Sequence, residues 1–117
     1  MIKPEKLAEY IDSGVIQIAP IGFMRGRTLD NAFVILDEGQ NATESQMKMF
    51  LTRMGKSAKF IITGDITQVD LPKNQRSGLK KAIQVLDDTK GIEIIFLDDT
   101  DVIRHKLVKK IIKAFKE

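Results

Sequence analysis

The sequence predicts an α/β fold in which a mostly parallel β-sheet carries helices on both faces. Two observations lead to this prediction. Unbroken apolar runs at 33–36 and 60–62 each end at polar residues, which is typical of strands buried on both faces of a parallel sheet. Strand patterns also alternate with helix patterns along the chain, and such alternation implies right-handed crossovers between parallel strands.

The composition is that of a globular protein. The 117 residues suffice for one domain, with 43% apolar and 30% charged residues, and no apolar run approaches the ~18–20 residues of a membrane span. The N-terminus lacks the pattern of a secretory signal and the chain has no cysteine, so we expect a cytoplasmic location. The net charge of +3 is compatible with a nucleic-acid partner but does not indicate one.

The N-terminal segment predicts a helix, a strand and a loop. Residues 4–11 form the helix, because a proline suits its first position and its apolar residues share a face. Val15–Ile18 has the β-branched pattern of a strand. Arg25 and Arg27 follow in a loop with two glycines, where a guanidinium could contact phosphate. Solvated loop arginines are the alternative.

The central strand predicted over Phe33–Leu36 runs directly into Asp37 and Glu38. Charge cannot lie cheaply inside a buried sheet, so the two carboxylates should mark its carboxyl edge. Open α/β sheets bind ligands at that edge, and phosphoryl transfer needs a carboxylate there for Mg²⁺ and a neighbour for the attacking water. On this stretch alone, two residues that end a strand and open a turn are an equal alternative.

A second helix and strand follow. The capping-box pattern at Thr43–Gln46 predicts a helix whose apolar residues recur at helical spacing as far as 54, and a glycine at 55 closes it. Lys59–Thr63 is the next predicted strand, and Gly64, Asp65 and Gln68 come after it. Two strands that end in this way favour a ligand edge, although a turn built on the glycine and aspartate is the simpler alternative.

The C-terminal segment predicts a helix, a strand and a last helix. Ser77 caps the first helix and Gly91 ends it. Ile92–Leu97 is a predicted strand, and an acidic turn over 98–101 leads into a helix with an inner apolar face over 108–115. Its lysines favour a solvated face, with RNA contact as the alternative: Lys109, Lys110, Lys113 and Lys116.

Five stretches together resemble the PhoH-like ATPases, which are P-loop proteins similar to the ATPase core of superfamily 1 helicases. They are Gly22–Leu29, Val34–Asn41, Thr63–Pro72, Gln75–Leu79 and Asp101–His105. Each motif is weak by itself, but the five occur in order over nearly the whole chain. The resemblance implies a partial P-loop NTPase fold of the Rossmann-like three-layer type, with residues 1–117 as a single domain.

The resemblance places the chemistry in the residues that follow the two central strands. Asp37 matches the Walker B aspartate, which holds Mg²⁺ directly or through water. Glu38 matches the residue that polarises the attacking water, and Gln40 matches a glutamine that senses the terminal phosphate. Asp65 and Gln68 match a Gly-Asp-x-x-Gln motif that couples the state of the phosphate to the nucleic-acid side. The implied cofactors are ATP and Mg²⁺.

Three arginines are implied near the same site. Arg104 matches an arginine finger, which would stabilise transition-state charge across a subunit boundary if the subunits form a ring. Arg25 and Arg27 belong to a motif near the site and are expected to contact the cofactor. His105 is expected to pack or to cap a helix rather than to carry protons. The implied partners are ATP, RNA and further copies of the chain, with no membrane.

Two departures from the family pattern matter. Gly39 and Ala42 stand where the family usually has Ala and Thr. More severely, the phosphate loop Gly-x-x-x-x-Gly-Lys-Ser/Thr occurs nowhere in the chain, so its backbone nest and its lysine are missing. We therefore expect the C-terminal part of a PhoH-like ATPase domain, linked to RNA metabolism in a full-length parent and inactive alone. The alternatives are a non-catalytic RNA-binding or assembly module, and an inert fragment that dimerises through an open strand edge.

Overall fold

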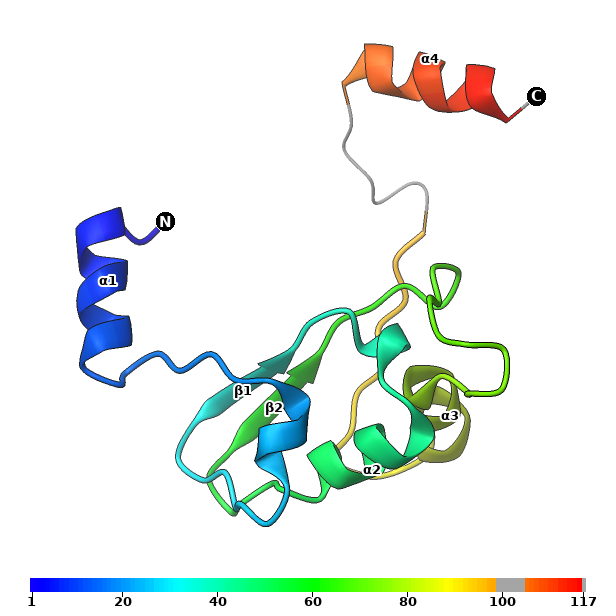
Figure 1. Cartoon of the computed structure of the whole chain (residues 1–117). Coiled ribbons are helices and arrows are strands. Elements are labelled where there is room, and N and C mark those ends of the chain that lie inside the picture. Colours follow the sequence, from blue (N-terminus) through cyan, green and yellow to red (C-terminus); the bar gives the residue numbers. More distant parts are fainter. Residues whose placement is uncertain (99–104, 117) are drawn as a thin grey trace. The chain divides into compact units, whose positions relative to one another are not determined.

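The computed structural model describes residues 1–98 and 105–116, which divide into two compact units, Met1–Leu86 and Asp87–Glu117 (Figure 1). The first unit contains α1 (Pro4–Asp12), the 3₁₀ turn η1 (Ile21–Met24), β1 (Phe33–Leu36), the 3₁₀ turn η2 (Gly39–Asn41), α2 (Glu44–Leu51), β2 (Lys59–Ile62) and α3 (Gly78–Leu86). The second contains α4 (Lys106–Phe115). Among the described residues the fold is therefore mixed α/β, as predicted at that level.

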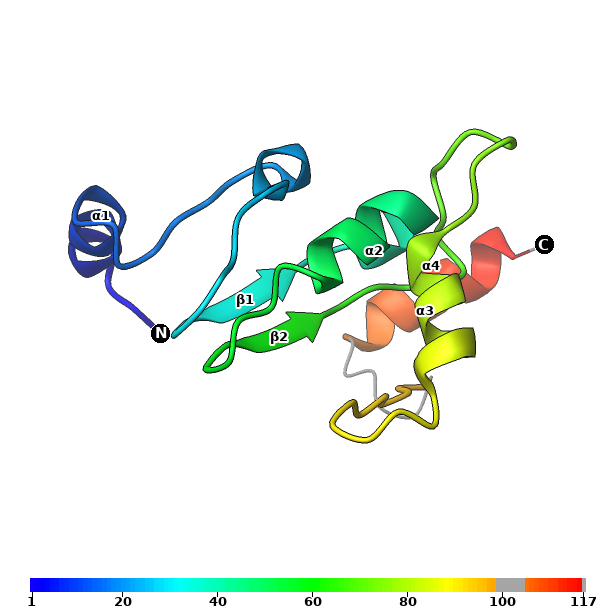
Figure 2. The same ribbon diagram turned by 90° about the horizontal axis from the view of Figure 1, so that it is seen from below.

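The two strands form a parallel pair. Phe33 lies opposite Lys59 and Leu36 lies opposite Ile62, and Figures 1 and 2 show β1 and β2 side by side and pointing the same way. The apolar runs form these strands because β-branched and aromatic side chains fit a pleated surface. The register brings the carboxyl ends of both strands to one edge of the sheet, where the polar residues that follow them meet.

One face of the strand pair forms the core with α2. Met47 and Phe50 of α2 are buried, and the ring of Phe50 lies 5.0 Å from that of Phe60 on β2. The capping box predicted for α2 is confirmed, because the Thr43 side chain accepts from the Gln46 N–H at 3.2 Å and the Gln46 side chain accepts from the Thr43 N–H at 2.9 Å. These bonds satisfy N–H groups that the first helical turn leaves free and so define where the helix begins.

The other face of the pair is open, which corrects the prediction of a sheet covered on both faces. Phe33 and Ile35 are 78% and 65% exposed, although they belong to an unbroken apolar run. No helix of the first unit covers them, so β1 alternates between exposed and half-buried side chains. The run has the composition of a doubly buried strand, whereas its observed burial is that of a strand covered on one face.

Two predicted strands are wrong. Val15–Ile18 and Ile92–Leu97 form no strand, because neither segment pairs with a neighbouring strand among the described residues. Their apolar side chains stay exposed, including Ile18 at 84% and Ile95 at 77%. A strand is stable only when a neighbouring strand satisfies its backbone groups, so composition alone did not suffice here. Helices α2 and α3 also end earlier than predicted, at Leu51 and Leu86.

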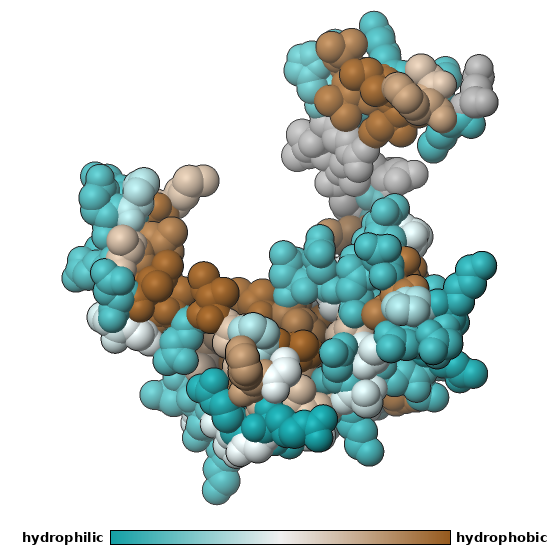
Figure 3. All heavy atoms as spheres, in the orientation of Figure 1, coloured by the Kyte–Doolittle hydropathy of each residue, from teal (hydrophilic) through white to brown (hydrophobic). Residues whose placement is uncertain are grey.

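In the second unit, α4 is amphipathic. Its apolar side chains gather on one side in Figure 3, with hydrophilic residues around them. None of its residues is buried, so the predicted inner face is not covered within this unit. The prediction for His105 is confirmed, since its Nδ1 accepts from the Leu107 N–H at 3.0 Å and caps the helix. No helix in the described part of the chain is long and apolar enough to cross a membrane.

Candidate functional site

A pocket of about 650 Å³ lies at the carboxyl ends of β1 and β2. It brings together five of the predicted site residues, which come from two stretches of chain: Asp37, Glu38, Gln40, Asp65 and Gln68. The sequence places the two stretches together because parallel strands end at the same edge. The prediction that these residues converge is therefore confirmed at the level of position, while their chemical roles stay predictions.

Asp37 is held in place by hydrogen bonds on one of its carboxylate oxygens. Its Oδ1 accepts from the Thr63 hydroxyl at 2.7 Å and from the Glu38 N–H at 3.0 Å. Oδ2 has no hydrogen-bond partner within 1–98 and 105–116. The carboxylate is therefore oriented by β2 through one oxygen, and the other remains available to a cation or a water molecule.

Glu38 has a left-handed backbone, with φ of 52° and ψ of 44°. A residue with a Cβ adopts this conformation at a cost of roughly 1–2 kcal/mol, and such residues gather at functional sites. The turn that follows is fixed by the Gly39 N–H, which donates to the Thr63 carbonyl at 2.8 Å, and by the Asn41 N–H, which donates to the Glu38 carbonyl at 3.0 Å. These bonds hold the Glu38 side chain, which is exposed, at the mouth of the pocket.

Gln40 is buried, with 5% of its surface exposed. Its Oε1 accepts from the Asp65 N–H at 3.1 Å, so its side chain already joins the two stretches that line the pocket. A Cβ at Gly64 would lie 2.7 Å from that same oxygen, which explains why a glycine precedes Asp65. Gln40 thus fastens one side of the pocket to the other through its Oε1.

The carboxylate of Asp65 accepts two hydrogen bonds from Thr67. The Thr67 hydroxyl donates at 2.6 Å and the Thr67 N–H donates at 2.9 Å, both to Oδ1. These bonds favour the ionised form, the hydroxyl more than the N–H, and hold the pKa of Asp65 below its ordinary value against a small opposing effect of desolvation. Asp65 is therefore ionised at neutral pH.

The pocket lining is acidic. Four carboxylates line it: Asp37, Glu38, Asp65 and Asp70. Among the described lining residues there is no lysine or arginine. Such a surface attracts cations and repels a free triphosphate, since close like charges raise the energy of both. The described residues that line the pocket thus offer no cationic side chain to an anion.

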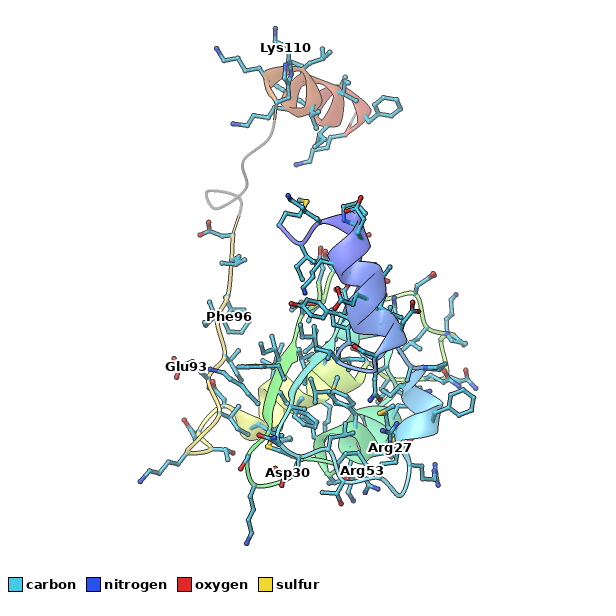
Figure 4. The ribbon with its side chains drawn as sticks, turned by 90° about the vertical axis from the view of Figure 1, so that its left-hand side faces the viewer. Arg27, Asp30, Arg53, Glu93, Phe96 and Lys110 are labelled. Atoms are coloured by element: carbon cyan, nitrogen blue, oxygen red, sulfur yellow. The ribbon has the colours of Figure 1, made fainter. Side chains whose placement is uncertain are left out.

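Arg25 and Arg27 do not line the pocket. They follow η1, which packs against α2, and Leu29, two residues after Arg27, donates its N–H to the Arg53 carbonyl at 2.7 Å (Arg27 and Arg53 are labelled in Figure 4). That is the amino end of the strands, because Asp30 precedes β1 and its Oδ1 accepts from the Ser57 N–H before β2, at 2.6 Å. Their contact with a cofactor remains an untested prediction. The predicted arginine finger, Arg104, lies outside the described residues.

Two residues in the pocket carry no role in the sequence prediction. Thr63 orients Asp37 through its hydroxyl. The feature of the sequence that could have indicated this role is the position of Thr63 directly after β2, the strand that pairs with β1. The Asn41 side chain accepts from the Asp70 N–H at 2.8 Å, across 29 positions of sequence. No local pattern indicates such a partner, because the bond exists only once η2 and the loop after β2 lie side by side.

A magnesium ion fits the donors that are present. Within the described residues no three acidic, histidine or cysteine side chains lie close enough to form a cage around a metal. Mg²⁺ does not require one, because it usually keeps several waters and binds through one or two carboxylates and the substrate phosphates. Asp37 would hold it through Oδ2, and the bound ion would supply positive charge for phosphate oxygens.

Comparison with known proteins agrees with the resemblance to the PhoH-like family. Residues 1–116 match the family described as PhoH-like protein. A PhoH-like protein of Bacillus subtilis is 59% identical over 105 residues, which cover 90% of this chain and 33% of that protein. A PhoH-like protein of Synechocystis is 52% identical over 114 residues, covering 97% and 35%. The Protein PhoH of Escherichia coli is 45% identical over 102 residues, covering 87% and 29%.

The chain thus spans about a third of the length of the curated relatives it matches. The family match extends over nearly all of its residues, and it includes both stretches that form the pocket. On this evidence, the chain belongs to the PhoH-like protein family.

Proposed function

We propose that this chain carries the metal-and-water half of an ATP-hydrolysing site, which acts in a longer PhoH-like protein. The observation that carries the proposal is the convergence of Asp37, Glu38 and Gln40 with Asp65 and Gln68 in one pocket at the carboxyl edge of a parallel strand pair. Ligand sites of α/β sheets lie at this edge. Family membership supports the same chemistry.

In this proposal each carboxylate has a separate task. Asp37, oriented by the Thr63 hydroxyl, holds Mg²⁺ through its free oxygen. Glu38, exposed at the mouth of the pocket, orients the attacking water. The strained backbone of Glu38 supports this role, since it fixes the direction of the side chain relative to Asp37. The residues that grip the phosphates lie in the rest of the longer protein.

The decisive experiment uses a full-length protein that contains this chain. Glu38→Gln keeps the size of the side chain and removes its charge, so ATP binding should persist while turnover falls by on the order of 10²-fold or more, as expected for the loss of a general base. Glu93→Gln is the matched control, because Glu93 is exposed and lies in the second unit, outside the pocket. Unchanged turnover in the Glu38 variant would reject the role given to that residue.

The 117-residue chain itself provides a second test. Its acidic pocket lacks cationic side chains, so isothermal titration should show no tight binding of Mg-ATP. Micromolar affinity would contradict the proposal that the phosphate-binding groups lie elsewhere.

Assembly is the alternative function that a specific observation favours. The outer edge of β1 has no partner strand within the described residues, and Phe33 and Ile35 are exposed beside it. Exposed strand edges pair readily with other chains. An assembly module of this kind would act through self-association. For the longer protein we also propose RNA binding, which would show as an affinity for RNA that falls steeply as the salt concentration rises.

A further inference from the structure

Three consecutive residues, the last two of the η2 turn and Ala42 directly after it, fasten the loop that follows β2. The Gln40 side chain accepts from the Asp65 N–H at 3.1 Å, and the Asn41 side chain accepts from the Asp70 N–H at 2.8 Å. The Ala42 carbonyl accepts from the Gly78 N–H at 2.7 Å. A single short turn therefore sets the start, the middle and the end of the segment 65–78.

The middle attachment is made by a single hydrogen bond. Residues 63–76 form no helix or strand, and loops of this length without secondary structure are uncommon and usually functional. Between Thr67 and Gln75, the bond from Asp70 to Asn41 is the one hydrogen bond to another element within the part of the chain that the structure describes. The remaining bonds of this stretch stay within the loop and do not fix its place relative to β1.

The loop segment in question is the far wall of the pocket, which we define as residues 65–70. It carries Asp65 and Gln68, which line the same pocket as Asp37 and Glu38. If Asn41 released Asp70, the far wall would remain attached at Asp65 and could swing about that point. The position of Gln68 relative to Asp37 and Glu38 would then no longer be defined.

We infer that Asn41 is a positioning residue, whose side-chain carbonyl holds the far wall in place relative to Asp37 and Glu38. The effect of this positioning on catalysis rests on the proposed function. The geometry of a site must be held within fractions of an ångström for proximity to accelerate a reaction. Asn41 is half-buried and is followed by the buried Ala42, so its backbone is itself anchored.

The first test measures amide hydrogen exchange by NMR in the 117-residue chain. Asn41→Ala should raise the exchange rate of the Asp70 amide by on the order of fivefold, the effect of one lost hydrogen bond, while the amides of β2 stay protected. Asn41→Asp keeps the accepting oxygen and should restore protection. Asn74→Ala is the matched control, since Asn74 lies exposed in the same loop and its side chain makes no hydrogen bond to any residue that the structure describes. Wild-type exchange at Asp70 in the Asn41→Ala chain would overturn the inference.

The second test asks whether the wall is positioned toward the carboxylates, which a purely stabilising bond would not require. Mn²⁺, used as a paramagnetic probe, should broaden the amides near Glu38 and those of the far wall in the wild-type chain. In Asn41→Ala the broadening near Glu38 should persist and that of the far wall should fall; equal broadening of the wall in both chains would overturn the inference. If Mn²⁺ broadens neither region of the wild-type chain, the proposed cation site is wrong, and the exchange experiment still decides the role of Asn41.

Discussion

Replacing Gly78 by alanine should destabilise the chain, because this glycine begins α3 at a point of close contact. A Cβ there would meet the Thr43 carbonyl oxygen and would lie 2.5 Å from the Met47 Cβ. Carbon atoms prefer about 3.5–4.0 Å, so the overlap with Met47 is on the order of 1 Å. Neither neighbour can move easily, since Thr43 belongs to a capping box and Met47 is buried.

The expected change in the free energy of unfolding combines two destabilising contributions with one stabilising contribution. Overpacking of this kind costs about 1–3 kcal/mol, and the Gly78 N–H would also be pushed from the Ala42 carbonyl, at roughly a further 1 kcal/mol. The better helix propensity of alanine offsets at most about 1 kcal/mol. We expect a net loss of about 2 kcal/mol, which lowers the urea midpoint by on the order of 1 M.

The assay is urea unfolding followed by circular dichroism. Gly22→Ala is the matched control, because a Cβ at Gly22 has nothing within 4 Å and its φ is not positive. That variant should be unchanged or more stable by up to about 1 kcal/mol, through a more restricted unfolded chain. A Gly78→Ala chain with a midpoint at or above the wild-type value would refute the close packing of α3 on the capping box.

Two further predictions concern the pocket and the open strand. In a ¹³C NMR titration, Thr67→Val should raise the lowered pKa of Asp65 toward its ordinary value, while Thr89→Val leaves it unchanged; an unaltered pKa in the first variant would exclude the hydroxyl as its main cause. Because the folded-state pKa is lowered, the stabilisation from these bonds is present above the unfolded-state pKa and is lost as the pH falls through the folded-state pKa. For the open strand, sedimentation of the wild-type chain should show self-association that rises with protein concentration. Ile35→Lys should abolish this association. A wild-type chain that stays monomeric at high concentration would contradict assembly through β1.

Features that depend on neighbours in sequence were predictable. The capping box at Thr43–Gln46 and the helix cap at His105 join residues no more than three positions apart, so the side-chain types and their spacing define them. The strands β1 and β2 were predictable because their apolar runs end abruptly at polar residues. Their parallel pairing then implied that Asp37 and Asp65 would meet at one edge.

Features that depend on partners distant in sequence were not predictable. Val15–Ile18 has the composition of a strand but remains unpaired, because no neighbouring strand satisfies its backbone within the described residues. Arg25 and Arg27 stand close to the motifs in sequence, yet the packing of η1 on α2 leaves them outside the pocket. Adjacency in sequence did not predict adjacency in space.

The sequence by itself determined the family of this protein, its helix caps, its two paired strands and three of its pocket carboxylates, Asp37, Glu38 and Asp65, since these follow from motifs and local chemistry. Only the tertiary structure decided that Gln40 and Asn41 clasp the loop after β2 and that one face of β1 stays exposed. The physical reason is that a hydrogen bond across 25 or 29 positions forms only when folding has brought both segments together, and no residue pattern along the chain records that meeting.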